Sequence, residues 1–151
     1  MKRHGWPWRG TIGGMPEMTA TEADQFLRET RIAKIAYLHE GGAPTIVPVW
    51  FEWDGEVARV FTSRTSPKAH RIAADPRVAL TVEEPVGVHE RWVTIEGTAA
   101  ISETGTVELL ARLARRYYDP VRAEQAIASW TVKPEMWVTL TITPSRIRSS
   151  K

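Results

Sequence analysis

The sequence predicts a mainly β protein, in which about six antiparallel strands close into a small barrel and helices fill three interruptions. Three observations support this class. In the segments at 77–83 and 136–143 apolar residues alternate with a period of two, as in strands. Tight turns such as Asp54-Gly55 join consecutive strands, which makes those neighbours antiparallel. Many short strands favour closure, because a closed sheet has no exposed edge.

Composition narrows the class of protein. The 151 residues suffice for one domain with a sizeable core. The absence of cysteine excludes disulfides, thiolate metal sites and cysteine nucleophiles. No apolar run approaches the roughly 18 residues of a membrane span. The basic start is not followed by an apolar segment, so we expect no secretory signal and a cytoplasmic protein.

Residues 1–18 are expected to form a flexible N-terminal extension, because they are rich in Gly, Pro, Trp and Arg and lack periodicity. Two alternatives stay open. The true start is Met15 or Met18, or the segment is an arm that docks Trp6 and Trp8 on the body or on a partner. The extension also accounts for the whole net charge of +2. A neutral remainder gives no support for a nucleic-acid partner.

The cofactor-binding domain is expected over residues 19–151. Thr19 and Glu22 have the spacing of a capping box, which opens a helix to about Glu29. The expected strands are residues 31–39, 45–53, 57–62, 77–83, 91–101 and 136–143. Residues beyond Pro144 are expected to form a polar, basic end.

Two residues indicate irregular strands. Pro48 removes a hydrogen-bond donor from the strand at 45–53, which suits a sheet edge, a bulge or a close approach by a ligand. Gly97 interrupts the strand at 91–101 and indicates a bend.

The strongest helical pattern covers residues 104–118, where Leu110 and Leu113 belong to a single apolar face. Asp119-Pro120 ends this helix. A second helical piece is expected to follow to about Ser129.

A short helix after Ser66 has the features of an anion site. Ser66 is a good N-cap, and Pro67 suits the first helical position. Lys68 in the first turn opposes the helix dipole, which favours anions there by roughly 0.3–1 kcal/mol. A bound anion would explain this lysine. The hydroxyls of Thr62, Ser63 and Ser66 and the ammonium of Lys68 would then converge on that anion.

Other motifs are scarce. The histidines lack the spacing of metal ligands, so no metal site is expected. Four of the seven tryptophans fall on expected strands: Trp50, Trp53, Trp92 and Trp137. Packing in the core or an interface is the first interpretation, and contact with a flat aromatic cofactor or substrate is the second.

Four segments in order resemble the split-barrel flavin-binding superfamily, which includes pyridoxamine 5′-phosphate oxidases and oxidoreductases dependent on the deazaflavin F420. The segments are Thr45 to Phe51, Phe61 to Lys68, Ala74 to Val78 and Val93 to Ala99. The resemblance implies a six-stranded, FMN-binding-like split barrel. It also implies a homodimer with two cofactor sites at the interface.

The resemblance further implies the cofactor-binding residues. The residues expected along the ring are Val47, Pro48, Val49 and Trp50. Those expected at the phosphate end are Thr62, Ser63, Ser66 and Lys68. The second subunit is expected to contribute Trp92, Trp137 and Arg146.

The FMN-binding oxidases carry arginines at positions held here by Thr45 or Ile46 and by Pro67. The resemblance therefore favours the F420 branch, with hydride transfer from reduced F420 to a small organic acceptor that the sequence does not name. One alternative is an FMN-dependent oxidase or reductase on the same barrel. Another is a non-catalytic flavin or haem binding, storage or sensing protein. Tyr117 and Tyr118 become possible proton donors if the second helix overhangs the pocket.

Overall fold

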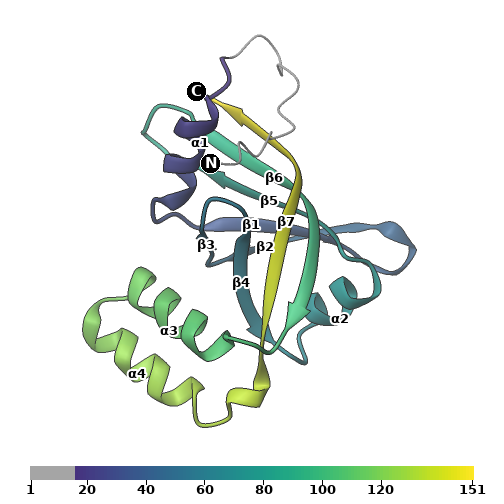
Figure 1. The fold of residues 1–151 in the computed structure, drawn as a ribbon, viewed down its shortest axis with the longest axis vertical. Coiled ribbons are helices and arrows are strands. Elements are labelled where there is room, and N and C mark those ends of the chain that lie inside the picture. Colours follow the sequence, from purple (N-terminus) through teal and green to yellow (C-terminus); the bar gives the residue numbers. More distant parts are fainter. Residues whose placement is uncertain (1–15) are drawn as a thin grey trace, which may run out of the picture.

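Seven antiparallel strands form one strongly curved sheet in the computed structural model, which describes residues 16–151 (Figure 1). The strands are β1 (Ala33–Leu38), β2 (Pro44–Val49), β3 (Glu52–Trp53), β4 (Ala58–Ser63), β5 (Arg77–Glu83), β6 (Trp92–Ser102) and β7 (Trp137–Ser150). Their order across the sheet is β2-β1-β5-β6-β7-β4-β3. The prediction of a mainly β, antiparallel, barrel-like fold with added helices is confirmed.

The strand count differs by one from the prediction because the segment at 45–53 divides into β2 and β3. These two strands lie at opposite edges of the sheet although only Trp50 and Phe51 separate them. The sheet therefore curls until its two edges meet at this dipeptide. Pro48 lies on edge strand β2, where its missing N–H removes no bond to a further strand.

The long hairpin of β6 and β7 bends at the predicted glycine. The register shifts between Glu96 and Gly97, which marks a β-bulge. A Cβ atom on Gly97 would lie 2.0 Å from the carbonyl oxygen of Thr143, so this position requires glycine. The bulge increases the bend of the two longest strands, which helps the sheet to curl.

The prediction for the C-terminal segment was wrong, because β7 continues to Ser150. Ile147 on β7 faces Ile95 on β6 and is buried in the core. Arg148 forms an ion pair with Glu96 at 2.7 Å. The basic residues alternate with buried ones, so their charge concealed a strand pattern.

Helix α1 (Ala20–Arg28) closes one end of the curled sheet (Figure 1). The predicted capping box is present, since Thr19 and Glu22 each bond the other's backbone N–H. Phe26 and Leu27 are buried with the inner-face residues of the sheet. Residues 1–15, with Trp6, Trp8 and Met15, lie outside the described residues. Met18 is buried against this end, and its N–H donates to Ser149 Oγ at 3.0 Å.

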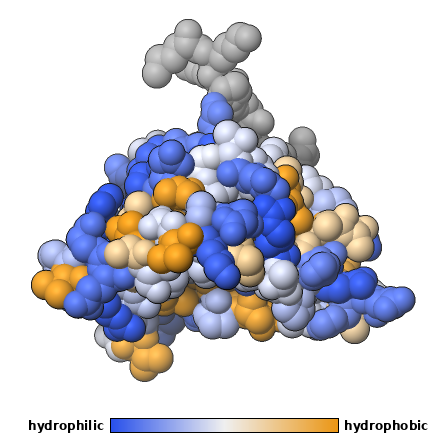
Figure 2. All heavy atoms as spheres, turned by 90° about the horizontal axis from the view of Figure 1, so that it is seen from below, coloured by the Kyte–Doolittle hydropathy of each residue, from blue (hydrophilic) through white to orange (hydrophobic). Residues whose placement is uncertain are grey.

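The remaining helices are α2 (Pro67–Ala74), α3 (Thr106–Tyr117) and α4 (Pro120–Trp130). Helix α2 inserts Ile72 into the core. Helix α3 packs on β4 and β7, where Thr106 and Thr139 hydroxyls lie 2.8 Å apart. Helix α4 packs on α3 as a hairpin and buries only Ala123 (Figure 1). On the face seen from below, apolar residues form several separate patches among hydrophilic ones (Figure 2).

Candidate functional site

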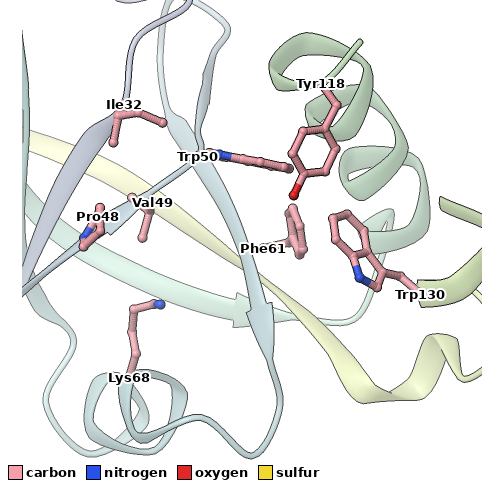
Figure 3. A pocket seen from close by; sticks show the side chains of 8 residues that line it. All are labelled: Ile32, Pro48, Val49, Trp50, Phe61, Lys68, Tyr118 and Trp130. Carbon is pink, nitrogen blue, oxygen red and sulfur yellow. The ribbon is translucent and has the colours of Figure 1, made fainter. Parts of the chain in front are cut away.

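A cavity of about 560 Å³ opens where the two edges of the sheet meet. Strands β2 and β4, helix α2 and the hairpin of α3 and α4 surround it (Figure 3). Its lining residues are Ile32, Pro48, Val49, Trp50, Phe61, Lys68, Tyr118 and Trp130. The cavity combines one cation with aliphatic and aromatic walls, and mostly apolar walls with a few polar groups are the usual composition of a small-molecule site.

Strand β2 supplies one wall. Pro48, Val49 and Trp50 line the cavity, as expected for residues along a ring. Val47 does not line it and instead packs against the buried core. Three of the four residues predicted beside the ring are therefore brought to this pocket.

Lys68 supplies the positive charge. It projects from the first turn of α2, and its ammonium points toward Pro48 and Val49 (Figure 3). The side chain is half-buried, and burial lowers its pKa below the ordinary value for lysine. No carboxylate within residues 16–151 forms an ion pair with it, and it donates no hydrogen bond to these residues. Lys68 is therefore a partly desolvated cation that is available to an anion.

The predicted hydroxyl residues lie near Lys68 but do not line the cavity. Ser66 caps α2, since its Oγ accepts a hydrogen bond from the Ala69 N–H at 3.1 Å. Thr62 Oγ1 lies 3.1 Å from Ser66 Oγ and is buried. Ser63 Oγ lies 3.1 Å from Thr65 Oγ1 in the exposed turn. These hydroxyls hold the turn that presents Lys68.

Aromatic side chains form the opposite wall. Phe61 projects from β4, and Trp130 comes from the end of α4. The ring centroids of these two residues are 5.7 Å apart. Tyr118, directly after α3, meets Trp50 edge-on at 4.7 Å. The helical hairpin thus overhangs the pocket, which was the condition for a tyrosine to reach it (Figure 3).

Tyr117 holds the aromatic wall to the sheet. Its ring stacks on Trp50 at 4.9 Å with an interplanar angle of 4°. Its hydroxyl donates to the carbonyl oxygen of Arg31 at 2.7 Å and accepts from the Phe51 N–H at 3.3 Å. Burial raises the pKa of Tyr117, so its hydroxyl stays protonated. Tyr117 is consequently a packing residue, and Tyr118 is the tyrosine that faces the cavity.

The three residues that were predicted to come from the second subunit do not line the cavity of their own chain. Trp137 packs behind the wall, 5.6 Å from Phe61, and its indole N–H donates to the Trp130 carbonyl at 2.9 Å. Trp92 lies at the start of β6, opposite Glu83 of β5. Arg146 lies on β7 opposite Glu96.

A second hollow of about 470 Å³ adjoins the first at Ile32. Its charged residues are paired within the chain: Arg31 with Glu84 at 3.0 Å, and Lys34 with Glu83. Two guanidinium groups, from Arg31 and Arg91, hold the pKa of Glu84 below its usual range. The pairing leaves the second hollow without the available charge that Lys68 gives to the cavity.

The sequence pattern of the pyridoxamine 5′-phosphate oxidase family matches residues 19–149. The chain belongs to this family. The resemblance predicted from four short segments is therefore confirmed. A search of curated protein sequences found no match.

Solved structures of similar fold include an F420 reductase, with 23% identity and a TM-score of 0.66 over 82% of this chain and 94% of that one. A conserved hypothetical protein from Mycobacterium tuberculosis has 24% identity and a TM-score of 0.72, over 95% of this chain and 90% of that one. A haem storage protein from Vibrio cholerae has 15% identity and a TM-score of 0.64, over 84% and 91%. At these identities the likeness shows the fold alone.

Within the family fold, three cavity residues were not predicted as site residues: Ile32, Phe61 and Trp130. Tyr118 was predicted only as a possible proton donor, on the condition that the second helix overhangs the pocket. Phe61 directly precedes the Thr62-Ser63 pair, so its position offered a local signal. Trp130 offered none, because its helix reaches the pocket only through the fold. None of the helices in residues 16–151 combines the length and apolarity of a membrane span.

Proposed function

We propose that the protein is an oxidoreductase that binds reduced F420 and transfers hydride to a small organic acceptor. The observation that supports this function best is Lys68, a half-buried cation without a partner in the described residues, facing strand β2 across the cavity. An anionic cofactor tail would give this ammonium its missing counter-charge. The aliphatic and aromatic walls suit a flat ring beside that tail.

In this proposal each residue has a role that its position supports. Pro48, Val49 and Trp50 line the ring, and Lys68 binds the phosphate. Thr62, Ser63 and Ser66 fix the turn and offer hydroxyls beside the phosphate. Bound deazaflavin supplies a carbon that donates hydride, while the protein supplies position and excludes water. The acceptor is a small unsaturated organic compound.

We also propose that two copies of the chain associate through the outer face of β2, β1, β5 and β6. One row of that face runs Ile46, Ala36, Ala79 and Glu96 across four strands, and Ile46 is 66% exposed. Ala36 and Ala79 make the middle of the row flat, and an exposed isoleucine beside them favours burial. By strand alternation Trp92 and Arg146 project from the same face, so a partner could receive them at its cavity.

The decisive experiment compares the affinities of F420 and FMN by fluorescence titration of the purified protein. We expect F420 to bind more tightly, because the arginine positions of FMN-binding oxidases hold Thr45 or Ile46 and Pro67 here. Tighter binding of FMN would support the FMN-dependent alternative. A haem spectrum in the purified protein, or F420 binding without turnover of any acceptor, would support a binding or storage protein.

The Lys68→Ala variant tests the residue that supports the proposal. We expect F420 affinity to fall about 10- to 100-fold, the effect of losing a hydrogen bond to a charged group. Lys133→Ala is the matched control, because Lys133 is exposed and does not line the cavity. Equal affinity of Lys68→Ala and wild type would refute the assignment of the anion site.

A further inference from the structure

Arg31 and Glu84 form a buried ion pair outside the cavity. Their side chains are 10% and 6% exposed, and the Arg31 guanidinium donates two hydrogen bonds to the carboxylate, at 3.0 and 3.1 Å. Arg91 contacts the same carboxylate. Burial removes water from these charges, and the desolvation cost offsets much of their attraction. Stability alone therefore accounts poorly for the pair, which directs attention to the parts of the fold that it holds in place.

The ion pair fixes the link between α1 and β1. Residues 30–32 belong to no helix or strand, so strand pairing does not set their position. The Arg31 guanidinium also donates to the Phe26 carbonyl oxygen at 2.8 Å and lies 3.9 Å from the centroid of the Phe26 ring. Arg31 is thus held between the end of α1 and Glu84, which directly follows β5. These side-chain contacts fix the Arg31 backbone.

The Arg31 backbone in turn supports one wall of the cavity. Its carbonyl oxygen accepts the hydrogen bond from the Tyr117 hydroxyl at 2.7 Å, and the Tyr117 ring stacks on Trp50 at 4.9 Å. Trp50 lies in the two-residue link between β2 and β3, so strand pairing does not fix it either. Ile32, which follows Arg31, lines the cavity together with Trp50 (Figure 3). A chain of contacts therefore leads from Glu84 through Arg31 and Tyr117 to Trp50.

We infer that Arg31 and Glu84 are positioning residues for the cofactor, which act through Tyr117 to hold Trp50 against the ring. This inference rests on the proposed function, in which Trp50 lines that ring. An indole that is already held in its bound orientation loses little freedom when the cofactor arrives, so its contact contributes more to affinity. A carboxylate outside the cavity thereby controls affinity inside it.

The test uses Glu84→Gln, which keeps the shape of the side chain and removes its charge. The protein is labelled with fluorotryptophan, and the fluorine NMR resonance of Trp50 is assigned by its loss in Trp50→Phe. We expect this resonance to shift in Glu84→Gln even without cofactor, because the stack on Tyr117 is loosened. The dissociation constant of F420 should rise about three- to tenfold, the scale of one neutral hydrogen bond.

Glu83→Gln is the matched control, because it makes the same chemical change on the adjacent residue. Glu83 also borders the second hollow, but it pairs with Lys34. We expect Glu83→Gln to leave both the Trp50 resonance and F420 affinity unchanged. Equal effects of the two substitutions would overturn the inference, and so would an unmoved Trp50 resonance in Glu84→Gln.

A double-mutant cycle distinguishes positioning from a general loss of stability. Tyr117→Phe removes the hydroxyl that links Arg31 to the ring stacked on Trp50. If Glu84 acts through this hydroxyl, adding Glu84→Gln to Tyr117→Phe should lower F420 affinity by less than about twofold further. Independent losses that multiply would contradict the inferred route through Tyr117.

Arg31→Lys takes the place of Glu84→Gln if that variant does not fold. Lysine keeps the positive charge but lacks the planar fork that makes both hydrogen bonds to the carboxylate. We expect the same shift of the Trp50 resonance, and an unchanged resonance would again overturn the inference. Failure of the wild type to bind F420 would refute the proposed function, while the resonance measured without cofactor would still test Arg31 and Glu84.

Discussion

Lys68 is a half-buried lysine, and its burial disfavours the charged form of the ammonium. Burial lowers its pKa, and no described carboxylate compensates. Desolvation without a partner is uncommon for lysine outside functional sites, because an exposed rotamer is usually available. Here the first turn of α2 directs the side chain over strand β2 instead of into solvent (Figure 3).

This pKa shift predicts how F420 affinity depends on pH. Lys68 binds an anion only when it is protonated, so affinity should fall as pH rises through its pKa, earlier than an exposed lysine would titrate. Lys68→Arg should retain affinity to higher pH, since arginine stays charged. Dissociation constants of both proteins measured across alkaline pH check this. The cofactor's own ionisation affects both proteins alike, so parallel curves would contradict the prediction.

Tyr117→Phe tests the structural role of the bonded phenol. Removing its hydroxyl leaves the Arg31 carbonyl and the Phe51 N–H without their partner in a half-buried place. We expect the free energy of unfolding to fall by about 1–3 kcal/mol, measured by urea denaturation. Tyr118→Phe should lie within about 0.5 kcal/mol of wild type, because its hydroxyl has no partner to lose. Equal destabilisation by both changes would contradict the distinction between the two tyrosines.

At the residue scale, the sequence predicted what local rules determine. Lys68 was identified from its place in a helix start, and Pro48 from its missing donor. Trp130 was not identified, because it reaches Phe61 only through the packing of α4 on α3. Contacts between residues that are far apart in the chain have no local signal.

Helix α2 combines two roles in its N-cap, and two substitutions separate them. Ser66→Ala removes the oxygen that accepts from the Ala69 N–H, and should cost about 1 kcal/mol of stability. Ser66→Asp keeps a capping oxygen and should retain stability, but its negative charge would repel the cofactor phosphate. We therefore expect F420 affinity to fall about tenfold in Ser66→Asp, at the scale of one charged contact. Unchanged affinity in this stable variant would argue against a phosphate at α2.

The bulge in β6 gives a prediction about stability. In Gly97→Ala the new Cβ would meet the Thr143 carbonyl oxygen at 2.0 Å, and a backbone atom cannot rotate away. We expect a loss of about 1–3 kcal/mol in the free energy of unfolding. Thr98→Val is the control, an exposed change of similar shape on the next residue. Wild-type stability in Gly97→Ala would mean that β7 shifts freely at Pro144.

Element ends were the least predictable part of the secondary structure. The largely apolar pattern of residues 45–53 continued through Trp50 and Phe51, yet the chain leaves β2 there because the sheet edge turns. The end of β7 was missed for the opposite reason. Its basic residues resembled a solvated tail, although Ile147 and Ser149 between them are buried. Whether alternating residues pair depends on a partner strand that the segment itself does not reveal.

At the scale of the molecule, tight turns predicted which consecutive strands pair, such as β1 with β2. No turn signal predicted that β7 pairs with β6 and with β4, because long stretches of chain separate these strands. These pairings follow from the curling of the sheet. Strand β7 joins the β2-β1-β5-β6 part of the sheet to the β4-β3 part, and the two edge strands then meet at Trp50. The cavity therefore exists only once the last strand is in place.

Closure leaves the row of Ile46, Ala36, Ala79 and Glu96 on the outer face uncovered by α3 and α4, which pack on the β4 and β7 side. If two chains meet there, an arginine at Ala79 would place a long charged side chain in a flat, desolvated contact. We expect Ala79→Arg to be monomeric in analytical ultracentrifugation, where wild type is dimeric.

Ala128→Arg on the exposed surface of α4 should stay dimeric, because it adds the same charge away from the row. If the partner's Trp92 and Arg146 complete the cofactor site, Ala79→Arg should lose both the dimer and F420 affinity. Ala128→Arg should keep both. A monomeric Ala79→Arg that binds F420 as wild type does would separate the two ideas: the chains would associate through this face, but each cavity would be complete in one chain.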